Sequence, residues 1–461
     1  MVVQHNMQAA NANRMLNITT GAQSKSTEKL SSGYRINRAA DDAAGLSISE
    51  KMRKQIRGLD KASSNAEDGV SSVQTAEGAL TEVHSMLQRM NELAVQASNG
   101  TNSDTDRGAI QDEISQLTTE IDRVAETTKF NETYLLKGGN GTKDVYMNGH
   151  DAGLKGTLTD SATTATFKVA AGALDAGKSV TIGGKDYTIG STLDETKALA
   201  NAAKAATNTS FTVDDTKYNV DAAGKITKDG DATEVTVDDI VKTGSKVSYD
   251  GKTLTAADID AATGVDKSDS SVISAAHAVD LMEKELTAAN NIGATKTAAT
   301  AQKAADYTSK DGVTFNIKKG TAEVADKLSF SLHVGSDADM TNKITVDIET
   351  MNSSYLGIKG LNVNDDSGIA GTYAIDAISD ALQKVSEQRS SLGAVQNRLE
   401  HTIDNLDNVV ENTTTAESRI RDTDMAEEMV NYSKNNILAQ AGQSMLAQAN
   451  QSNQGVLSLL Q

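Results

Sequence analysis

Two adjacent aspartates, Asp41 and Asp42, stand just before a long helical pattern and are the first residues that could do chemistry. Paired carboxylates can act as general acid and base, or can hold a metal ion. In the sequence, no histidine and no third carboxylate lies near them at ligand spacing. Carboxylate oxygens also suit the start of a helix, where the first backbone N–H groups lack partners. We therefore expect this pair to cap the helix or to contact another subunit.

Other residues with metal or nucleophile chemistry are scattered. The chain has no cysteine, which excludes disulfides and thiolate sites, and its six histidines form no HExxH motif or other ligand pair. The run Gly335-Ser-Asp-Ala-Asp339 offers oxygens for calcium, but it lacks the twelve-residue loop with a closing glutamate. We expect a hairpin turn there. The sequence contains no Walker loop, nucleophile elbow or Rossmann fingerprint, so it predicts no catalytic residue, no metal site and no cofactor.

The charge balance argues against two classes of partner. A formal net charge of −19 disfavours nucleic acid, because phosphate binding depends mainly on positive charge. The one basic cluster consists of Lys51, Arg53, Lys54, Arg57 and Lys61. Acidic residues are interleaved with it at helical spacing, so we expect a solvated or subunit-facing side of a helix. No run approaches eighteen consecutive apolar residues, and the N-terminus lacks a secretory signal pattern, so no membrane insertion is expected.

One stretch must position most of the rest. Alternating steps of three and four select only apolar residues or glycine, namely Leu59, Ala62, Ala66, Gly69, Val73, Ala76, Leu80, Val83, Leu87, Met90, Ala94 and Ala97. A 3.5-residue period sustained this long is the signature of a helix with one seam facing partner helices. Half of these side chains are alanine or glycine, so we expect the partners to approach closely.

Two further stretches repeat this period. After a polar turn at 99–106, Ile110 to Val124 predicts a helix that folds back antiparallel. From Ile375 to Val410 the same alternation predicts a helix of about 54 Å, a length match for the first. The middle is rich in Thr, Gly and Asp, and predicts hairpins at 180–189 and 247–254 and strands at 313–317, 328–334 and 344–348. Alanine-rich helices are expected at 193–206 and 256–262.

These elements predict an α+β multidomain chain. A long antiparallel helical bundle or coiled coil is built from both termini, with β-rich central outer domains inserted between its parts. We expect terminal coiled-coil segments at 1–40 and 421–461, bundle segments at 41–137 and 373–420, variable outer domains at 138–325, and a returning β segment at 326–372.

Both ends of the chain avoid ions. Residues 1–24 contain one full side-chain charge, Arg14, and residues 435–461 contain none, although 23% of the chain is charged. Their weakly amphipathic helices bury too little to offset the ordering entropy alone, so we expect them to be largely disordered in a lone molecule. Packing among copies would suit them, since buried charges need partners. The self-assembly residues would be Met7, Met15, Ile18, Leu438, Met445 and Leu460. The alternative is a pair of mobile tails.

The motifs at both ends resemble those of bacterial flagellins. They are Leu30-Ser-Ser-Gly-Tyr-Arg-Ile-Asn37 with Asp41-Asp-Ala-Ala-Gly45, then Asn397-Arg-Leu-Glu400, Ala416-Glu-Ser-Arg-Ile-Arg-Asp-Thr-Asp-Met425, Leu446-Ala-Gln-Ala-Asn-Gln451 and Leu457-Ser-Leu-Leu460. The resemblance covers about residues 1–137 and 325–461. It implies a secreted, extracellular filament subunit of the flagellum, exported unfolded by the flagellar type III apparatus. The implied partners are further copies, an export chaperone, the cap and hook-associated proteins.

The resemblance also implies recognition by host Toll-like receptor 5. The receptor motif of the family maps onto Gln88, Arg89, Leu93, Gln96, Ile110 and Glu113, whereas Asn91 replaces an arginine common in strongly stimulating members. Arg89 and Leu93 lie four apart, so one helical face can present both. Packing between subunits is the other interpretation of these residues.

Two other functions stay open. A hook–filament junction protein would share the architecture, and some family members carry an enzyme in the insert. In the sequence, residues 140–325 show no catalytic constellation.

Overall fold

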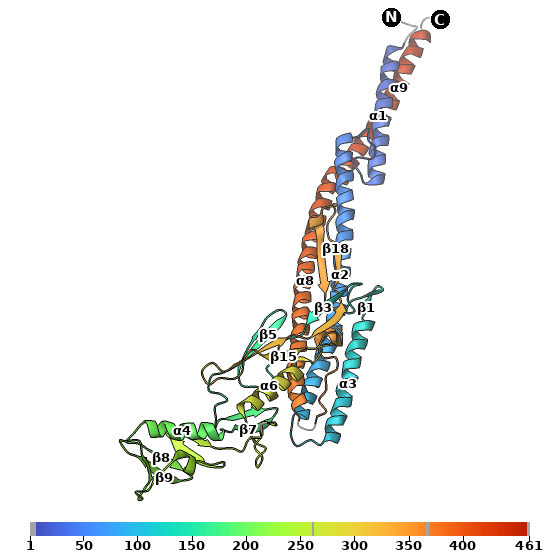
Figure 1. Cartoon of the computed structure of the whole chain (residues 1–461). Coiled ribbons are helices and arrows are strands. Elements are labelled where there is room, and N and C mark those ends of the chain that lie inside the picture. Colours follow the sequence, from blue (N-terminus) through green and yellow to red (C-terminus); the bar gives the residue numbers. More distant parts are fainter. Residues whose placement is uncertain (1–5, 261, 366–367, 459–461) are drawn as a thin grey trace. The chain divides into compact units, whose positions relative to one another are not determined.

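The computed structural model describes residues 6–260, 262–365 and 368–458, and its chain forms two compact units. Unit 1 comprises residues 1–71, 331–346 and 395–461, and unit 2 comprises 72–330 and 347–394. The helices are α1 (Met7–Ser32), α2 (Ala43–Ala97), α3 (Asp104–Thr127), α4 (Leu193–Ala205), α5 (Val237–Ile240), α6 (Ala275–Asn290), α7 (Ser353–Leu356), α8 (Ile369–Arg421) and α9 (Met425–Ser458) (Figure 1). Long terminal helices with a β-rich middle confirm the predicted fold class.

The predicted seam of α2 is buried at all twelve positions, from Leu59 to Ala97. In unit 1, Leu59 and Ala62 share a cluster with Leu406 of α8, and Ala66 shares another with Leu399. Along α8, every seventh residue is buried, namely Ile378, Val385, Leu392, Leu399 and Leu406. The 3.5-residue period therefore predicted the packed faces of both long helices.

The hairpin of β18 (Leu328–His333) and β19 (Lys343–Ile348) lies on α2 within unit 1 through its residues 331–346. A Cβ on Gly69 would lie 2.2 Å from Leu332 Cδ1, so the Leu332 side chain fills the space that a larger residue at 69 would need. Asn65 Nδ2 donates a hydrogen bond to the carbonyl of His333 at 3.0 Å. The run 335–339 and the short 3-10 helix η1 (Met340–Asn342) connect the strands, which confirms the predicted turn.

Asp41 and Asp42 accept hydrogen bonds from backbone N–H groups near the start of α2, as expected. Asp42 Oδ1 accepts the N–H of Gly45 at 2.8 Å and so caps the first turn of α2. Asp41 Oδ2 accepts the N–H groups of Arg38 and Asn37 at 3.0 and 3.2 Å. These backbone hydrogen bonds, that of Arg38 first, lower the pKa of Asp41. Both carboxylates thus serve the turn that leads into α2.

In unit 2, α3 begins with a capping box between Ser103 and Asp106. Arg107 is buried and its Nε donates to the carbonyl of Ala97, the last residue of α2, at 3.1 Å. Ile114 and Ile121 of α3 are fully buried. The turn and the returning helix agree with the sequence prediction, but the turn ends at Ser103, before the predicted limit at 106, because α3 begins at Asp104.

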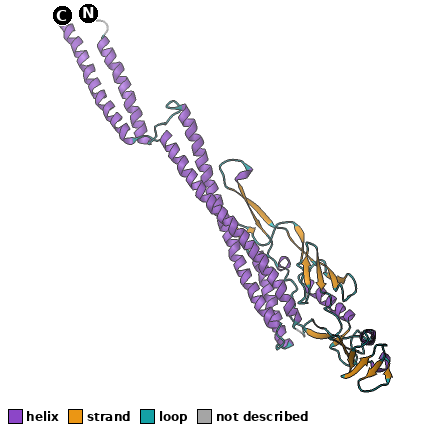
Figure 2. Cartoon of the chain, turned by 90° about the vertical axis from the view of Figure 1, so that its left-hand side faces the viewer, coloured by secondary structure: helices purple, strands orange, loops and turns teal. Residues whose placement is uncertain are grey.

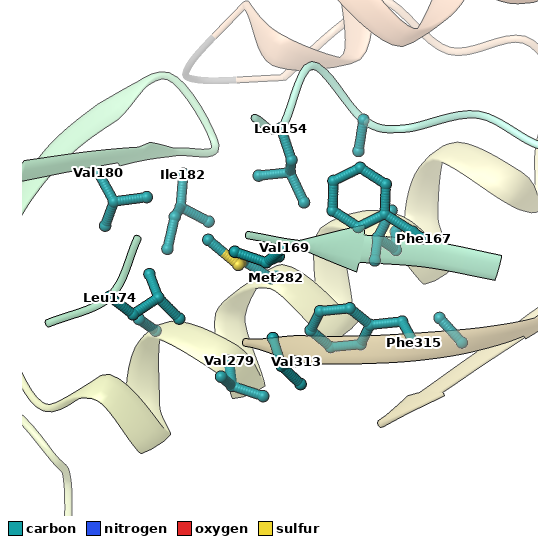
Figure 3. Packing of buried hydrophobic residues seen from close by; sticks show 14 of the residues in the cluster. Leu154, Phe167, Val169, Leu174, Val180, Ile182, Val279, Met282, Val313 and Phe315 are labelled. Carbon is teal, nitrogen blue, oxygen red and sulfur yellow. The ribbon is translucent and has the colours of Figure 1, made fainter. Parts of the chain in front are cut away.

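The larger core of the insert, in unit 2, packs α6 against a four-stranded sheet (Figure 3). The order is β15 (Thr300–Lys303), β16 (Val313–Lys318), β5 (Thr164–Val169), β4 (Thr157–Asp160). Phe315 of β16 pairs with Phe167 of β5 in antiparallel register, and their ring centroids lie 6.3 Å apart. A three-stranded sheet, β14 (Val272–Ile273), β7 (Lys185–Ile189), β6 (Ser179–Ile182), contributes to the same core.

A second core lies under α4, again within unit 2. Its six-stranded sheet has the order β11 (Glu234–Val235), β10 (Ile226–Lys228), β9 (Thr216–Val220), β8 (Ser210–Val213), β12 (Lys246–Tyr249), β13 (Lys252–Thr255). Two-stranded pairs join β1 (Lys129–Phe130) to β2 (Thr133–Tyr134) and β17 (Thr321–Ala325) to β3 (Thr142–Tyr146). Both predicted hairpins are present, as β6–β7 and β12–β13.

The second alanine-rich helix, expected at 256–262, was wrong for the residues that the structure describes there. Ala256 forms a parallel bridge with Ser191, and its N–H donates to the carbonyl of Ser245 at 2.9 Å. The N–H of Ala257 donates to the carbonyl of Ser191 at 3.0 Å. Strand-type hydrogen bonds therefore take the backbone donors that a helix would have used.

Candidate functional surfaces

The terminal helices α1 and α9 pack against each other along a narrow seam within unit 1 (Figures 1 and 2). The more shielded residues of α9 recur at three and four and include Ala439, Gly442, Leu446 and Ala449. A Cβ on Gly442 would lie 3.3 Å from Leu16 Cδ1 of α1. Asn6 Nδ2 donates to the carbonyl of Ala449 at 3.1 Å. Small side chains thus let the helices approach but bury little apolar area.

The predicted self-assembly residues lie outside this seam. Met7, Met15, Ile18, Leu438 and Met445 are all exposed in the single chain, Met7 at 72%. Leu460 lies outside the described residues. An apolar side chain that remains in water gains no burial energy, so this face is free to pack on a partner.

Sequence reasoning missed two further members of this face. Val430 and Ile437 of α9 are each 67% exposed. Val430 and Ile437 are seven residues apart, and so are Leu438 and Met445. On a helix this spacing places both pairs away from the side that carries Ala439 and Leu446. That spacing was the available signal. We call Val430, Ile437, Leu438 and Met445 the α9 stripe.

A short clasp connects the terminal helices to the long helices in unit 1. Gly33 ends α1 at a φ of 76°, which favours glycine. Arg35 N–H donates to the carbonyl of Arg421 at 2.7 Å, and Thr423 N–H donates to the carbonyl of Gly33 at 3.0 Å. The guanidinium of Arg421 lies 4.9 Å from the ring centroid of Tyr34. These contacts join the segment after α1 (33–35) to the segment between α8 and α9 (421–423).

The residues assigned to receptor recognition lie on α2 and α3, all within unit 2. Arg89 Nε donates to Glu113 Oε1 at 2.9 Å, and Arg89 is also paired with Glu92. These hydrogen bonds, with Glu113 first, raise the pKa of Arg89. Gln88 and Gln96 are exposed, so four of the six residues reach the surface.

Leu93 and Ile110, the other two residues assigned to receptor recognition, are buried. Leu93 is 2% exposed and Ile110 is 6% exposed, because both take part in the apolar packing of this unit. The expectation that one face presents both Arg89 and Leu93 is corrected here: a step of four along α2 passes from the exposed side to the buried seam.

The part of α8 that lies in unit 2 carries shielded ionisable groups. Burial lowers the pKa of Lys384, whose Nζ donates to the carbonyl of Tyr355 at 2.9 Å. Burial raises the pKa of Asp376, and the nearby carboxylates of Asp151 and Asp380 raise it further against the opposing effect of His150. Lys384 thus joins α8 to α7 (Ser353–Leu356) within unit 2.

The described part of the chain contains no cluster of His, Cys, Asp or Glu side chains that could hold a metal ion. A search of its helices finds none that is long and apolar enough to cross a membrane.

Comparisons with known proteins agree with the two terminal patterns. Residues 3–141 match the bacterial flagellin N-terminal helical region, and residues 375–460 match the bacterial flagellin C-terminal helical region. A flagellin of Clostridium tyrobutyricum is 40% identical over 457 residues, which cover 98% of this chain and 100% of the relative. A flagellin of Bacillus subtilis (strain 168) is 37% identical over 462 residues, covering 100% of both.

Among solved structures, flagellar hook associated protein-3 from Legionella pneumophila matches 80% of this chain and 98% of its own. Its identity is 13% and the TM-score is 0.34. The full-length relatives are decisive, and the chain belongs to the bacterial flagellin family.

Proposed function

We propose that this chain is the repeating, extracellular subunit of a bacterial flagellar filament, with a structural rather than an enzymatic role. Membership of the flagellin family supports this assignment. The observation that carries it in this chain is the set of exposed apolar residues on α1 and α9, two helices whose outer parts are nearly free of charge.

The chemistry of that face suits other copies of the same helices. Burying a Val, Leu, Ile or Met side chain contributes about 1.5–3 kcal/mol. Ile437 and Met445 stay exposed in the single chain, and every copy offers the same residues. A partner helix without charges lets Asn and Gln side chains pair across the contact and leaves no ion buried without a counterion.

Deletion of residues 435–461 tests this proposal. The deleted chain should remain a folded, soluble monomer that no longer polymerises, as measured by sedimentation and by electron microscopy of purified protein. Long filaments from the intact chain support a filament subunit, whereas short or absent polymers would favour a hook–filament junction protein. Unimpaired filament growth by the deleted chain would refute assembly through the termini.

We further propose export of the unfolded chain by the flagellar type III apparatus, with an export chaperone, the cap and hook-associated proteins as partners. Family membership supports this part. Secretion should stop in a strain that lacks the flagellar export apparatus and continue in one that lacks only the general secretory pathway. Secretion in the first strain would contradict it.

Recognition by Toll-like receptor 5 is proposed for the α2–α3 surface. Gln88, Arg89, Gln96 and Glu113 are its accessible members. Arg89→Ala should weaken receptor signalling by purified monomer, whereas Arg123→Ala, which removes another exposed arginine paired on α3, should not. Equal signalling by both variants would leave Arg89 with a purely structural role.

An enzymatic insert remains the alternative for the middle of the chain. A protease and glycosidase assay on the intact chain should show no activity above buffer, and turnover by the purified chain would replace this part of the proposal.

A further inference from the structure

One side of α2, within unit 1, carries positive charge without partners. Lys54, Arg57 and Lys61 are exposed and recur at three and four, so they form one stripe opposite the seam at Leu59. None of the three forms an ion pair with a described residue. Their neighbour Arg53 differs, since its guanidinium lies 3.4 Å from Glu417 of α8. We call Lys54, Arg57 and Lys61 the basic stripe.

A complementary stripe lies on α8 in the same unit. Glu400, Asp404, Asp407 and Glu411 are exposed and recur at four, three and four. Asp407 Oδ1 accepts a hydrogen bond from Ser63 Oγ at 3.2 Å, and none of the four makes an ion pair within the described chain. Four carboxylates on one helix face repel one another unless a cation lies against them. We call these residues the acidic stripe.

The two stripes overlap in level within the unit. Arg53 contacts Glu417, Ser63 contacts Asp407, and Ala66 packs with Leu399, so α8 runs antiparallel to α2 here. Continuing the register of the two side-chain contacts places 54–61 of α2 beside 409–416 of α8, at the Glu411 end of the acidic stripe. Because the basic stripe points away from α8, it cannot pair with the acidic stripe of its own chain.

We propose that the basic stripe of one copy docks against the acidic stripe of a neighbouring copy, as a second, electrostatic contact of the polymer. This inference rests on the proposed function, because it needs a filament. The contact is heterologous, since each copy donates one stripe and accepts the other, and such contacts generate open polymers. Opposite charges on two exposed stripes that overlap in level are the charge complementarity that selects another copy of this chain. Nucleic acid is disfavoured as the occupant by the net charge of −19.

Charge reversal of each stripe tests the pairing in the full-length chain. The basic-stripe variant is K54E/R57E/K61E, and the acidic-stripe variant is E400K/D404K/E411K, which leaves Asp407 and its contact with Ser63 intact. Each should raise the critical concentration for polymerisation about tenfold in dilute salt, since like charges then face each other. The chain that carries both sets should polymerise as the unchanged chain does, because the stripes are complementary again.

A control for the basic-stripe variant makes the same change of net charge elsewhere. Lys217, Lys228 and Lys246 are exposed in the insert and form no ion pair within the described chain. K217E/K228E/K246E should therefore polymerise normally. In 1 M salt the defect of the single-stripe variants should shrink, because the screening length falls to about 3 Å. Circular dichroism of each monomer checks that the helices are intact.

The outcomes separate this inference from the proposed function. If the unchanged chain forms no filaments, the proposed function fails first. If it forms them and both single-stripe variants match it, the stripe contact is refuted while assembly through the termini stands. If both variants fail and the combined chain is not rescued, the stripes do not face each other, which also overturns the inference.

Discussion

The β-rich insert and the terminal helices treat their apolar side chains in opposite ways. Phe167 and Phe315 of the insert are fully buried against each other and against α6 (Figure 3). Ile437 and Met445 of α9 are exposed, while mostly small residues such as Ala439 and Gly442 face α1. The insert is therefore stabilised by contacts within the chain, whereas the termini leave apolar side chains exposed that neighbouring copies can bury. The terminal helices should therefore become more ordered as the protein concentration rises, whereas the structure of the insert should not change with concentration.

The largest effect is expected in the insert. Phe315→Ala removes a fully buried ring and should lower the free energy of unfolding of the insert by about 3–5 kcal/mol. Urea unfolding measured on monomer gives this value. Tyr146→Ala is the matched control, because Tyr146 is exposed and should cost less than about 0.5 kcal/mol. Equal costs for both would mean that the insert lacks a specific core.

Substitutions in the terminal helices should affect polymerisation and leave monomer stability nearly unchanged. Ile437→Ser with Met445→Ser should change monomer stability by less than about 0.5 kcal/mol, because both side chains are already exposed. Their loss should nevertheless raise the critical concentration for polymerisation at least tenfold, on the order of 2 kcal/mol. Met340→Ser, which changes an equally exposed methionine outside α1 and α9, is the control. If the double-serine variant had a less stable monomer but polymerised normally, these side chains would stabilise the single chain and not the polymer.

A smaller effect tests the entry into α2. Asp42→Ala removes the side-chain acceptor for the Gly45 N–H and should cost about 1 kcal/mol. Asp42→Asn keeps an acceptor and should cost only part of that. Thermal unfolding compares the two. An alanine variant as stable as the asparagine variant would show that the cap contributes nothing.

The smallest effect is a dependence on pH. Burial raises the pKa of Asp376 above its usual value, so the folded chain binds this proton more tightly than the unfolded chain. Its contribution to stability is present at low pH and is lost as the pH rises through the folded pKa. Asp376→Asn should therefore gain stability relative to the original chain at pH 7 and lose that advantage near pH 4. A constant difference between the two chains would contradict the shift.

The sequence predicted the packed faces of the long helices well, because one heptad period determines which side of a helix is buried. The seam from Leu59 to Ala97 and the hairpin turns at Gly183-Gly184 and Asp250-Gly251 depend on local spacing alone. Such features need no knowledge of distant residues.

The start of α8 at Ile369, six residues before the expected position, is set by a local cap that the apolar period does not show: the Asp365 carboxylate accepts the N–H groups of Gly368 and Ile369. Features set by distant partners also escaped prediction. The strand-like backbone of Ala256 depends on Ser191 and Ser245, far away in sequence. Leu93 is buried although Arg89, four residues before it, and Gln96, three residues after it, are exposed. The domain boundaries stay a prediction.

Amide hydrogen exchange of the intact chain, first dilute and then polymerised, shows whether the terminal helices depend on neighbouring copies. We expect rapid exchange at 7–32 and 425–458 in dilute solution, strong protection of the same residues in the polymer, and unchanged slow exchange in β5 and β16. Strong protection of both terminal helices in dilute monomer would contradict it, since those helices would then need no neighbours.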